Sequence, residues 1–361
     1  MSNFRFELIS SHKYGDGHYA WASAIDEKKR MRIQVGTLEN DYYLYSEDLG
    51  NSWIRTEGEN NPSLNYKQLK DGSYISLAFN NLVVGHINIK QDKIPCIIKI
   101  VKAECMDDIL SGNINVDFAL IDIPDLSVGY GDSGGYHCSV VDHGLIQLED
   151  GSLIATMYGQ FKSDIVKVDY FDEYDFYQYR SWCIKSNDNG KTWEFLSTIA
   201  DVQTHPIHTE AEGYCEPDLL HLGDGHILAV IRTMGHEVYS PMYACHSYDS
   251  GKTWDKPIEI HKDGVFPRVI QTENGCIVCT SGKVGIFLLA SEDGYKWQDA
   301  FYISDNDGKW DKGPSGYHCL LEVAPNEILV VFDNTEDKIS EFKSPEMRRK
   351  LFINRYKVIK E

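Results

Sequence analysis

Two charged residues on either side of an apolar segment could do chemistry together. Glu216 precedes the turn Asp224-Gly225, and Arg232 ends the apolar run that follows, sixteen residues after the glutamate. A guanidinium at the end of an apolar strand is costly to bury without an anion. Because that anion could be a ligand or Glu216 itself, both residues are candidates for a site.

Tyrosine–histidine pairs form a second set of candidates. The segment Gly135-Tyr136-His137-Cys138 is repeated as Gly316-Tyr317-His318-Cys319, and His143 lies just beyond the first copy. Histidine can act as a general acid or base near neutral pH. A phenol can attack a carbon that carries a carboxylate without the charge repulsion an Asp or Glu would meet, if a base removes its proton. Further candidates for contact with an anionic substrate are Arg268, Lys283 and His236.

Each candidate has a structural alternative. A tyrosine at this place could line the core and bond to a backbone carbonyl, and Glu216 could be a solvated loop carboxylate. The pattern His205-x-x-His208 lacks a third ligand nearby in the sequence, which makes it a weak metal signal. We therefore expect no metal and no cofactor.

The composition limits the class of protein. The 361 residues include 55 Asp and Glu against 35 Lys and Arg, a net charge of −20, and 42% are hydrophobic. Such a chain can bury a large core, and its acidity disfavours nucleic acid or an anionic membrane as partner. Residues 1–19 lack the basic and apolar blocks of a signal peptide, which predicts a cytoplasmic location. The nine cysteines are scattered singly, so we expect small buried hydrophobes without disulfides.

A repeated turn motif gives the first signal of the fold. Ser, Asp, Gly and Trp recur at similar spacing, which is typical of a tight turn whose Trp packs on a sheet. The Asp accepts hydrogen bonds from turn amides, so these residues are structural. The four copies are Ser46–Trp53, Ser186–Trp193, Ser247–Trp254 and the shortened Ser291–Trp297.

A second repeat alternates with the first. Turns at positions 71, 150, 224, 274 and 326 each precede a strand that is apolar on both faces. Such strands need sheets on both sides, as when small sheets stack radially. We predict an all-β single domain over residues 1–361: a six-bladed β-propeller with four-stranded antiparallel blades. The expected blades are 15–58, 60–105, 130–200, 211–260, 263–304 and 313–361, with Phe4–Ile9 beside Leu351–Val358.

The four Trp-bearing turns resemble the Asp boxes of the sialidase superfamily, and the likeness covers nearly the whole chain. Glu216 and Arg232 match the sialidase segment that carries a glutamate and an arginine at similar spacing, and Tyr317 matches the segment of the nucleophilic tyrosine. The resemblance implies that Tyr317 is the nucleophile and Glu216 its base. It also implies that Arg232, with Arg268, holds the substrate carboxylate.

The chain departs from the sialidase pattern at its start. Sialidases have an Arg-Ile-Pro segment followed by an aspartate that serves as general acid. The nearest segment here is Met31-Arg32-Ile33-Gln34, which lacks the proline, and Asp41 is the nearest following aspartate outside the box. The expected function is an exo-acting glycosidase that releases a terminal acidic sugar from an oligosaccharide. One alternative is a hydrolase or lyase for uronate-containing glycans that uses His143 or His137. Another is a non-catalytic glycan-binding propeller, and the oligomeric state stays open.

Overall fold

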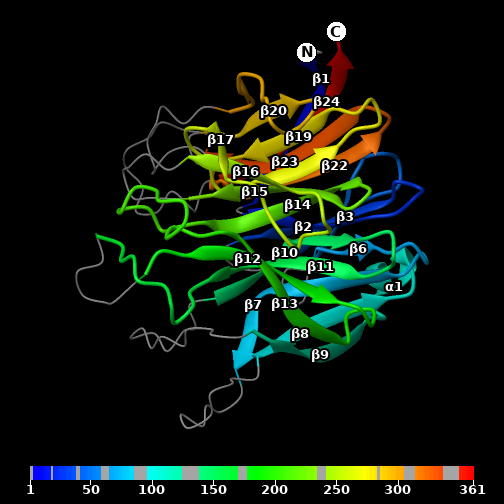
Figure 1. The fold of residues 1–361 in the computed structure, drawn as a ribbon. Helices are drawn as coiled ribbons and strands as arrows, with labels where there is room; N and C mark the ends of the chain where they lie inside the picture. Colours follow the sequence, from blue (N-terminus) through cyan, green and yellow to red (C-terminus); the bar gives the residue numbers. More distant parts are fainter. Residues whose placement is uncertain are drawn as a thin grey trace, which may run out of the picture. The chain divides into compact units, whose positions relative to one another are not determined.

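The computed structural model describes residues 3–17, 19–37, 41–57, 65–84, 96–123, 138–169, 177–233, 241–282, 285–304, 314–335 and 349–361. More than half of these residues lie in strands, and the short helix α1 (Met106–Ser111) is the one α-helix among them (Figure 1). The predicted all-β class is confirmed. The chain divides into two compact units: unit 1 is Met1–Tyr66 with Asp263–Glu361, and unit 2 is Lys67–Lys262.

Unit 1 contains three four-stranded sheets within the described ranges. Neighbouring strands pair antiparallel throughout. The strands of each sheet follow in spatial order. The first sheet runs β2 (Tyr19–Ile25), β3 (Met31–Gly36), β4 (Tyr42–Ser46) and β5 (Ile54–Glu57), and the second runs β18 (Arg268–Gln271), β19 (Ile277–Ser281), β20 (Phe287–Ser291) and β21 (Phe301–Tyr302). The third runs β1 (Phe4–Asp16), β24 (Arg349–Lys360), β23 (Glu327–Thr335) and β22 (His318–Ala324).

Unit 2 contains one eight-stranded and one four-stranded sheet in its described part. The larger sheet runs β10 (Cys138–Gln147), β11 (Leu153–Gly159), β12 (Arg180–Ser186), β13 (Thr192–Ala200), β9 (Asn115–Asp122), β8 (Cys96–Ala103), β7 (Tyr74–Val84) and β6 (Lys67–Gln68). The smaller sheet runs β14 (Cys215–Gly223), β15 (His226–Arg232), β16 (Met242–Ser247) and β17 (Ile258–His261).

The N-terminal strand lies where the sequence predicts it. β1 pairs antiparallel with β24, with Phe4 opposite Lys360 and Tyr14 opposite Leu351. The two ends of the chain therefore share one sheet of unit 1. The predicted neighbourhood of Phe4–Ile9 and Leu351–Val358 is confirmed.

Both predicted turn types are present. In the box at Ser186, the Asp188 carboxylate accepts the Thr192 backbone N–H at 2.9 Å and the Thr192 hydroxyl at 2.7 Å, and the indole of Trp193 donates to the Gly190 carbonyl at 3.1 Å. Trp193 is buried. The boxes thus close the turn between the third and fourth strands of a sheet, as in β12 and β13. The second turn type joins the first two strands, as Asp224-Gly225 does between β14 and β15.

The eight-stranded sheet departs from the predicted blade boundaries. Its two antiparallel runs of four strands join where β13 pairs in parallel with β9, Thr192 lying opposite Leu120. The predicted unit 60–105 is too short, because α1 and β9 follow it and complete the run β6 to β9. The sequence between 105 and 130 lacks the turn and box motifs, so it gave no signal for a fourth strand.

The second strand of most sheets forms the core. β11, β15 and β19 are buried along nearly their whole length, which explains why they are apolar on both faces. Of the cysteines whose side chains are described, Cys105 is exposed and the others are buried. The prediction of buried cysteines is wrong for Cys105, which precedes the surface helix α1. No helix among the described residues is long and apolar enough to cross a membrane.

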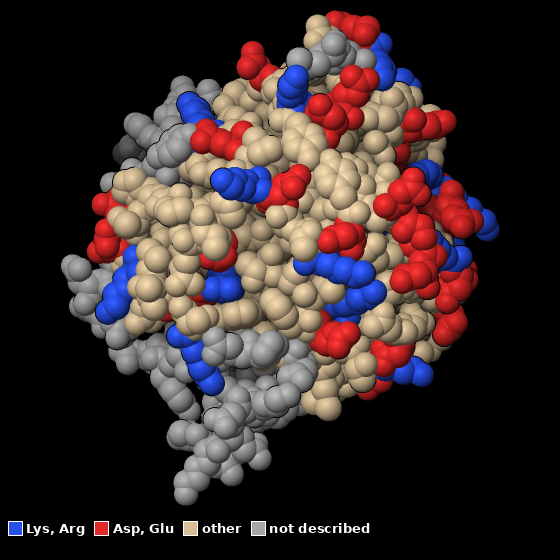
Figure 2. Space-filling model, viewed as in Figure 1, with Lys and Arg blue, Asp and Glu red and all other residues tan. Residues whose placement is uncertain are grey.

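Acidic side chains are interspersed with Lys and Arg on the face drawn in Figure 2. This mixture fits a chain whose 35 basic residues are distributed among 55 acidic ones.

Candidate functional site

Glu216 and Arg232 form a buried ion pair in unit 2. Arg232 Nη2 donates to Glu216 Oε1 at 2.7 Å, and Arg232 Nε lies 2.7 Å from Glu216 Oε2. Glu216 is 2% exposed and Arg232 5%. The guanidinium at the end of the apolar strand therefore has its anion within the protein, which is one of the two alternatives that the sequence left open.

Strand register brings the two residues together. β14 starts where β15 ends, with Cys215 opposite Arg232, and the register then shifts before Asp218. Glu216 lies in this irregularity and has a φ of 49°. Left-handed backbone is uncommon outside glycine and costs free energy. Asp224 and Asn326 adopt it in turns, whereas Glu216 adopts it within a strand.

The segment that leads into Glu216 is fastened to the start of β12. The N–H of Tyr179 donates to the Glu212 carbonyl at 2.7 Å, and the N–H of Tyr214 donates to the Tyr179 carbonyl at 2.9 Å. Between them, Gly213 has a φ of 105°, and a Cβ there would lie 2.2 Å from the Tyr179 backbone nitrogen. Only glycine fits this contact, so the backbone before Glu216 has one permitted path.

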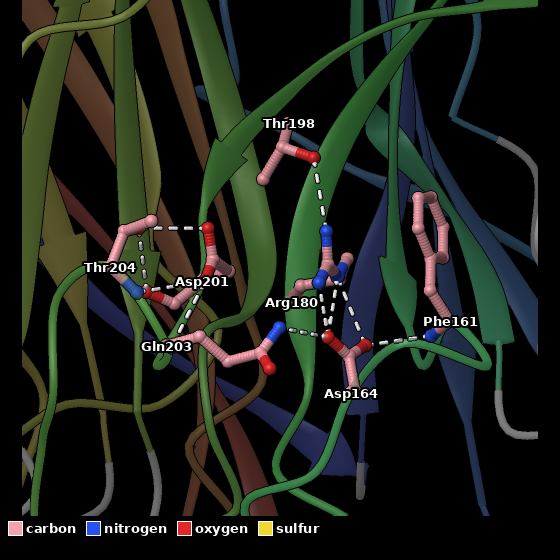
Figure 3. Close-up of polar contacts among 7 residues, drawn as sticks. All are labelled: Phe161, Asp164, Arg180, Thr198, Asp201, Gln203 and Thr204. Carbon is pink, nitrogen blue, oxygen red and sulfur yellow. Dashed lines mark hydrogen bonds and ion pairs between the residues drawn. The ribbon is translucent and has the colours of Figure 1, made fainter.

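A second buried ion pair, Asp164–Arg180, lies beside this segment (Figure 3). Arg180 Nε lies 2.9 Å from Asp164 Oδ2, which also accepts the Phe161 N–H at 2.7 Å. The guanidinium lies 4.5 Å from the centre of the Phe161 ring. Gln203 Nε2 donates to Asp164 Oδ1 at 3.2 Å. The cluster therefore joins both ends of the β11–β12 connection to the connection that leads into β14.

His143 lies in a bulge of β10 formed by residues 142–144. Gly144 packs so closely there that a Cβ would lie 2.8 Å from the Pro217 carbonyl oxygen. Pro217 follows Glu216 directly, so the backbone next to the buried His143 contacts the start of β14. The segments that carry the predicted catalytic residues Glu216 and His143 thus form one cluster of unit 2.

Tyr158, near the end of β11, belongs to the same cluster. Its ring meets the edge of the Tyr179 ring with the centroids 5.2 Å apart. Burial raises the pKa of the Tyr158 phenol well above its usual value, and the nearby Glu216 charge raises it further, while the Arg232 charge opposes both. No sequence pattern singled out Tyr158, because it is one of 22 tyrosines and ends a strand that looks like plain core.

Tyr317 lies in an aromatic cluster of unit 1. Its half-buried ring is 5.0 Å from Phe266 and 5.1 Å from Tyr19, which it meets edge to face. Arg268, at the start of β18, places its guanidinium carbon 5.8 Å from the centre of the Phe266 ring. The structure therefore brings Tyr317 and Arg268 to the same aromatic ring. Tyr317 and Glu216 belong to different units, and their pairing stays a prediction.

A third buried ion pair anchors the segment before Tyr317. Arg349 Nη1 lies 2.6 Å from Asp333 Oδ2, and the Ser315 hydroxyl donates to Asp333 Oδ1 at 2.6 Å. The N–H of Tyr317 donates in turn to Ser315 Oγ at 3.3 Å. Asp333 and Arg349 were not among the residues predicted from the sequence. Their signal was the spacing of sixteen residues, which also separates the partners in the Asp164–Arg180 and Glu216–Arg232 pairs.

Both ring nitrogens of His318 form hydrogen bonds within the protein. The Nδ1 lies 2.9 Å from the Gly316 carbonyl, and the Nε2 is hydrogen-bonded to the Thr280 hydroxyl. The ring is fully buried. Contact between His318 and a substrate stays a prediction.

Several predicted residues lie outside the described residues. They are Tyr136, His137, His236 and Lys283. Of the two residues at the start of the chain, Arg32 lies over the Tyr43 ring at 3.6 Å and Asp41 accepts a hydrogen bond from Gln34 at 2.8 Å. In the part of the chain that the structure describes, no three His, Cys, Asp or Glu side chains are grouped to hold a metal ion.

Comparisons with known proteins agree with the Asp-box motifs. The family model of the BNR repeat-like domain matches residues 132–309. No curated protein matches the sequence. A protein of unknown function from Dyadobacter fermentans has a similar structure, with 13% identity and a TM-score of 0.64, over 98% of this chain and 99% of that one.

Two solved enzymes share the fold, with similar sequence identities and TM-scores. The Penicillium chrysogenum α-L-arabinanase, solved with arabinobiose, has 14% identity and a TM-score of 0.57 over 95% of this chain and 98% of its own. The Trypanosoma rangeli sialidase, solved with the inhibitor DANA, has 12% identity and a TM-score of 0.55 over 97% of this chain. The match spans 60% of that sialidase. The predicted resemblance is confirmed at this level: residues 132–309 match the BNR repeat-like domain, and the chain shares its fold with solved sialidases and an arabinanase.

Proposed function

We propose that this protein is a glycoside hydrolase that releases a terminal acidic sugar from an oligosaccharide. Tyr317 is the nucleophile, Glu216 is its base, and Arg232 and Arg268 hold the substrate carboxylate. The reaction proceeds through a sugar bound covalently to the tyrosine, as expected for this class of glycosidase.

The proposed steps balance as follows. The Tyr317 oxygen bonds to the anomeric carbon while its proton passes to Glu216. The bond to the leaving-group oxygen breaks, and that oxygen takes a proton from a general acid or from water. Water then attacks the anomeric carbon and gives a proton to the conjugate base, or the hydroxide, left from the first step. The bond to tyrosine breaks, and the proton on Glu216 passes to the phenolate oxygen. The products are the free acidic sugar and the shortened oligosaccharide.

The observation that carries this proposal is the buried Glu216–Arg232 pair on a left-handed backbone. Glu216 has carboxylate oxygens that could receive a proton when a phenol attacks the sugar. Arg232 can meanwhile bring positive charge to an anionic substrate.

The aromatic cluster around Tyr317 supports the same function. A half-buried phenol framed by Phe266 and Tyr19 is fixed in direction, and Arg268 brings a cation to that cluster. An aromatic surface with one cation suits the apolar face and carboxylate of an acidic sugar.

The bulge at His143 favours a second candidate function. A buried imidazole beside the strand that carries Glu216 could transfer protons in a hydrolase or lyase for uronate-containing glycans. In that reaction Glu216 and His143 do the chemistry within unit 2.

We also propose that the chain forms a six-bladed propeller in one domain. The two antiparallel runs of the eight-stranded sheet each have four strands, as the other sheets do. Counted as two blades, they bring the total over the described sheets to six.

The test is an activity assay on purified protein with 4-methylumbelliferyl sialic acid and a panel of acidic plant and bacterial glycans. The proposal expects turnover that Tyr317→Phe abolishes. Turnover that survives Tyr317→Phe and is lost with His143→Ala would favour the second function. Binding without turnover on any substrate would overturn both in favour of a glycan-binding protein.

A further inference from the structure

Tyr158 is a phenol at the Glu216–Arg232 pair to which neither the family resemblance nor the proposed mechanism gives a role. It lies on β11, one residue before the strand ends at Gly159. Thr156, two residues earlier and so on the same face of the strand, donates its hydroxyl to the Pro217 carbonyl at 2.8 Å. Strand alternation therefore directs Tyr158 toward the start of β14, where Glu216 lies.

The electrostatic surroundings of the phenol agree with this placement. The charges that act on Tyr158 are those of Glu216 and Arg232, along with the Cys215 thiol and the Tyr179 phenol. Burial and the Glu216 charge raise the pKa of Tyr158 well above its usual value. The hydroxyl is therefore neutral across the physiological pH range and keeps its proton as a hydrogen-bond donor.

The ring of Tyr158 is fixed, but its hydroxyl is not engaged. Tyr179 meets it edge to face, and the backbone of Tyr179 is held by Glu212 and Tyr214. Among the described residues, none forms a hydrogen bond with the Tyr158 hydroxyl. The residue as a whole is half-buried. Buried tyrosine hydroxyls usually find a partner within the protein.

We infer that Tyr158 is a substrate-contacting residue: its hydroxyl donates a hydrogen bond to an oxygen of the sugar bound at the Glu216–Arg232 pair. A neutral donor suits this place, because a further cation would compete with Arg232 for Glu216 and a further acid would repel the substrate. The inference rests on the proposed function insofar as the ligand is a sugar.

The experiment is isothermal titration of three probes into wild type, Tyr158→Phe and Tyr248→Phe. The probes are the sialidase inhibitor DANA, arabinobiose and glucuronic acid, which cover an acidic sugar analogue, a neutral sugar and a uronate. Tyr158→Phe keeps the ring contact with Tyr179 and removes only the hydroxyl. Tyr248→Phe is the matched control, since Tyr248 is 58% exposed beside the box at Ser247 and stacks on His226.

We expect at least one probe to bind wild type, with roughly five- to tenfold weaker binding to Tyr158→Phe, the loss of one hydrogen bond to a neutral donor. Tyr248→Phe should bind as wild type does. On a substrate that is turned over, Tyr158→Phe should raise KM by a similar factor and leave kcat within about twofold.

Binding to Tyr158→Phe within twofold of wild type would overturn the inference, as would failure of all three probes to bind wild type. The proposed function is judged separately. If Tyr317→Phe abolishes turnover while Tyr158→Phe binds normally, the inference fails and the function stands. If Tyr158→Phe weakens binding while Tyr317→Phe retains turnover, the reverse holds.

Discussion

The Glu216 region of unit 2 and the Tyr317 region of unit 1 each contain a buried carboxylate–guanidinium pair. The two carboxylates differ in their hydrogen-bonding partners. Asp333 accepts hydrogen bonds from Arg349 and from the Ser315 hydroxyl and backbone N–H, so it holds the segment before Tyr317. The Glu216 carboxylate has Arg232 as its one hydrogen-bonding partner among the described residues. Asp333 therefore fixes backbone, whereas Glu216 is held by a guanidinium alone in the part of the chain that the structure describes.

The Asp164–Arg180 pair shows which of the two patterns is the general one. Asp164 accepts the Phe161 N–H and lies after the second strand of its sheet, and Arg180 starts the third. Asp333 lies near the end of β23, and Arg349 starts β24. Two pairs therefore hold the connection between the second and third strands of a sheet. Glu216–Arg232 instead spans the first and second strands, and only its acid has a left-handed backbone.

The largest effect should come from Glu216→Gln, which keeps the shape of the side chain and removes its charge. If Glu216 is the base, kcat should fall by about two to four orders of magnitude. Steady-state kinetics on the substrate found in the glycan assay measures this. Asp164→Asn is the matched control, because it makes the same chemical change in a pair that holds backbone. Equal losses of kcat at constant folded fraction would remove the distinction between the two kinds of pair.

The next largest effect should be on the free energy of unfolding, when Asp333 is replaced. Asp333→Ala leaves Arg349 buried without its anion, so we expect a loss of about 3–5 kcal/mol in the free energy of unfolding. Urea titration followed by tryptophan fluorescence measures it. The double variant Asp333→Ala with Arg349→Met removes both charges and should recover part of the loss. A double variant no more stable than the single one would contradict an uncompensated charge as the cause.

Most of the fold could be predicted from repeats, because turn chemistry is local. Asp188 and Gly190 form the turn of an Asp box through contacts within the box itself. The strand β15 could be recognised because it is apolar on both faces. β9 could not be predicted in this way. Its exposed Val116, Phe118 and Leu120 give no core pattern, and it pairs in parallel with a strand more than seventy residues away.

The candidate site could be predicted only where a charged residue stands at the end of an apolar segment. Glu216 and Arg232 stood out for that reason. Asp164 and Asp333 did not, because a carboxylate in a loop of an acidic chain is unremarkable until the fold brings an arginine to it. Tyr158 was missed since its significance depends on a neighbouring strand and not on the residues next to it in sequence.

Glycines at backbone contacts offer a third comparison between the two regions. A Cβ on Gly213 of unit 2 would lie 2.2 Å from the Tyr179 nitrogen, and one on Gly282 of unit 1 would lie 2.3 Å from Gly316 Cα. Either Gly→Ala variant should lose about 1–3 kcal/mol of stability by overpacking, with Gly213 at the upper end because its φ is positive. Gly72→Ala is the control: it has a positive φ of 88° but nothing within 4 Å. Thermal unfolding of the three variants compares them. A Gly213→Ala loss no greater than that of Gly72→Ala would show that the contact can relax.

The smallest effect should be a difference between the Asp boxes of the two units in how much stability their carboxylates contribute at acid pH. In unit 2, the Thr192 hydroxyl and backbone N–H lower the pKa of Asp188 to about 2. In the shortened box of unit 1, burial opposes the backbone bonds from Lys296 and Tyr295, and the pKa of Asp293 is lowered with no Thr hydroxyl to help. A carboxylate with a lowered folded-state pKa adds stability that is present above its unfolded value and lost as pH falls toward the folded one. Asp188→Asn should therefore flatten the fall in stability between about pH 4 and pH 2 by under about 1 kcal/mol, since the group is screened by solvent. Asp293→Asn should flatten it less, and urea midpoints across this pH range decide. A larger effect at Asp293 would mean that the backbone donors and the Ser291 hydroxyl suffice to hold the box carboxylate, and that the hydroxyl at the end of the full box adds nothing.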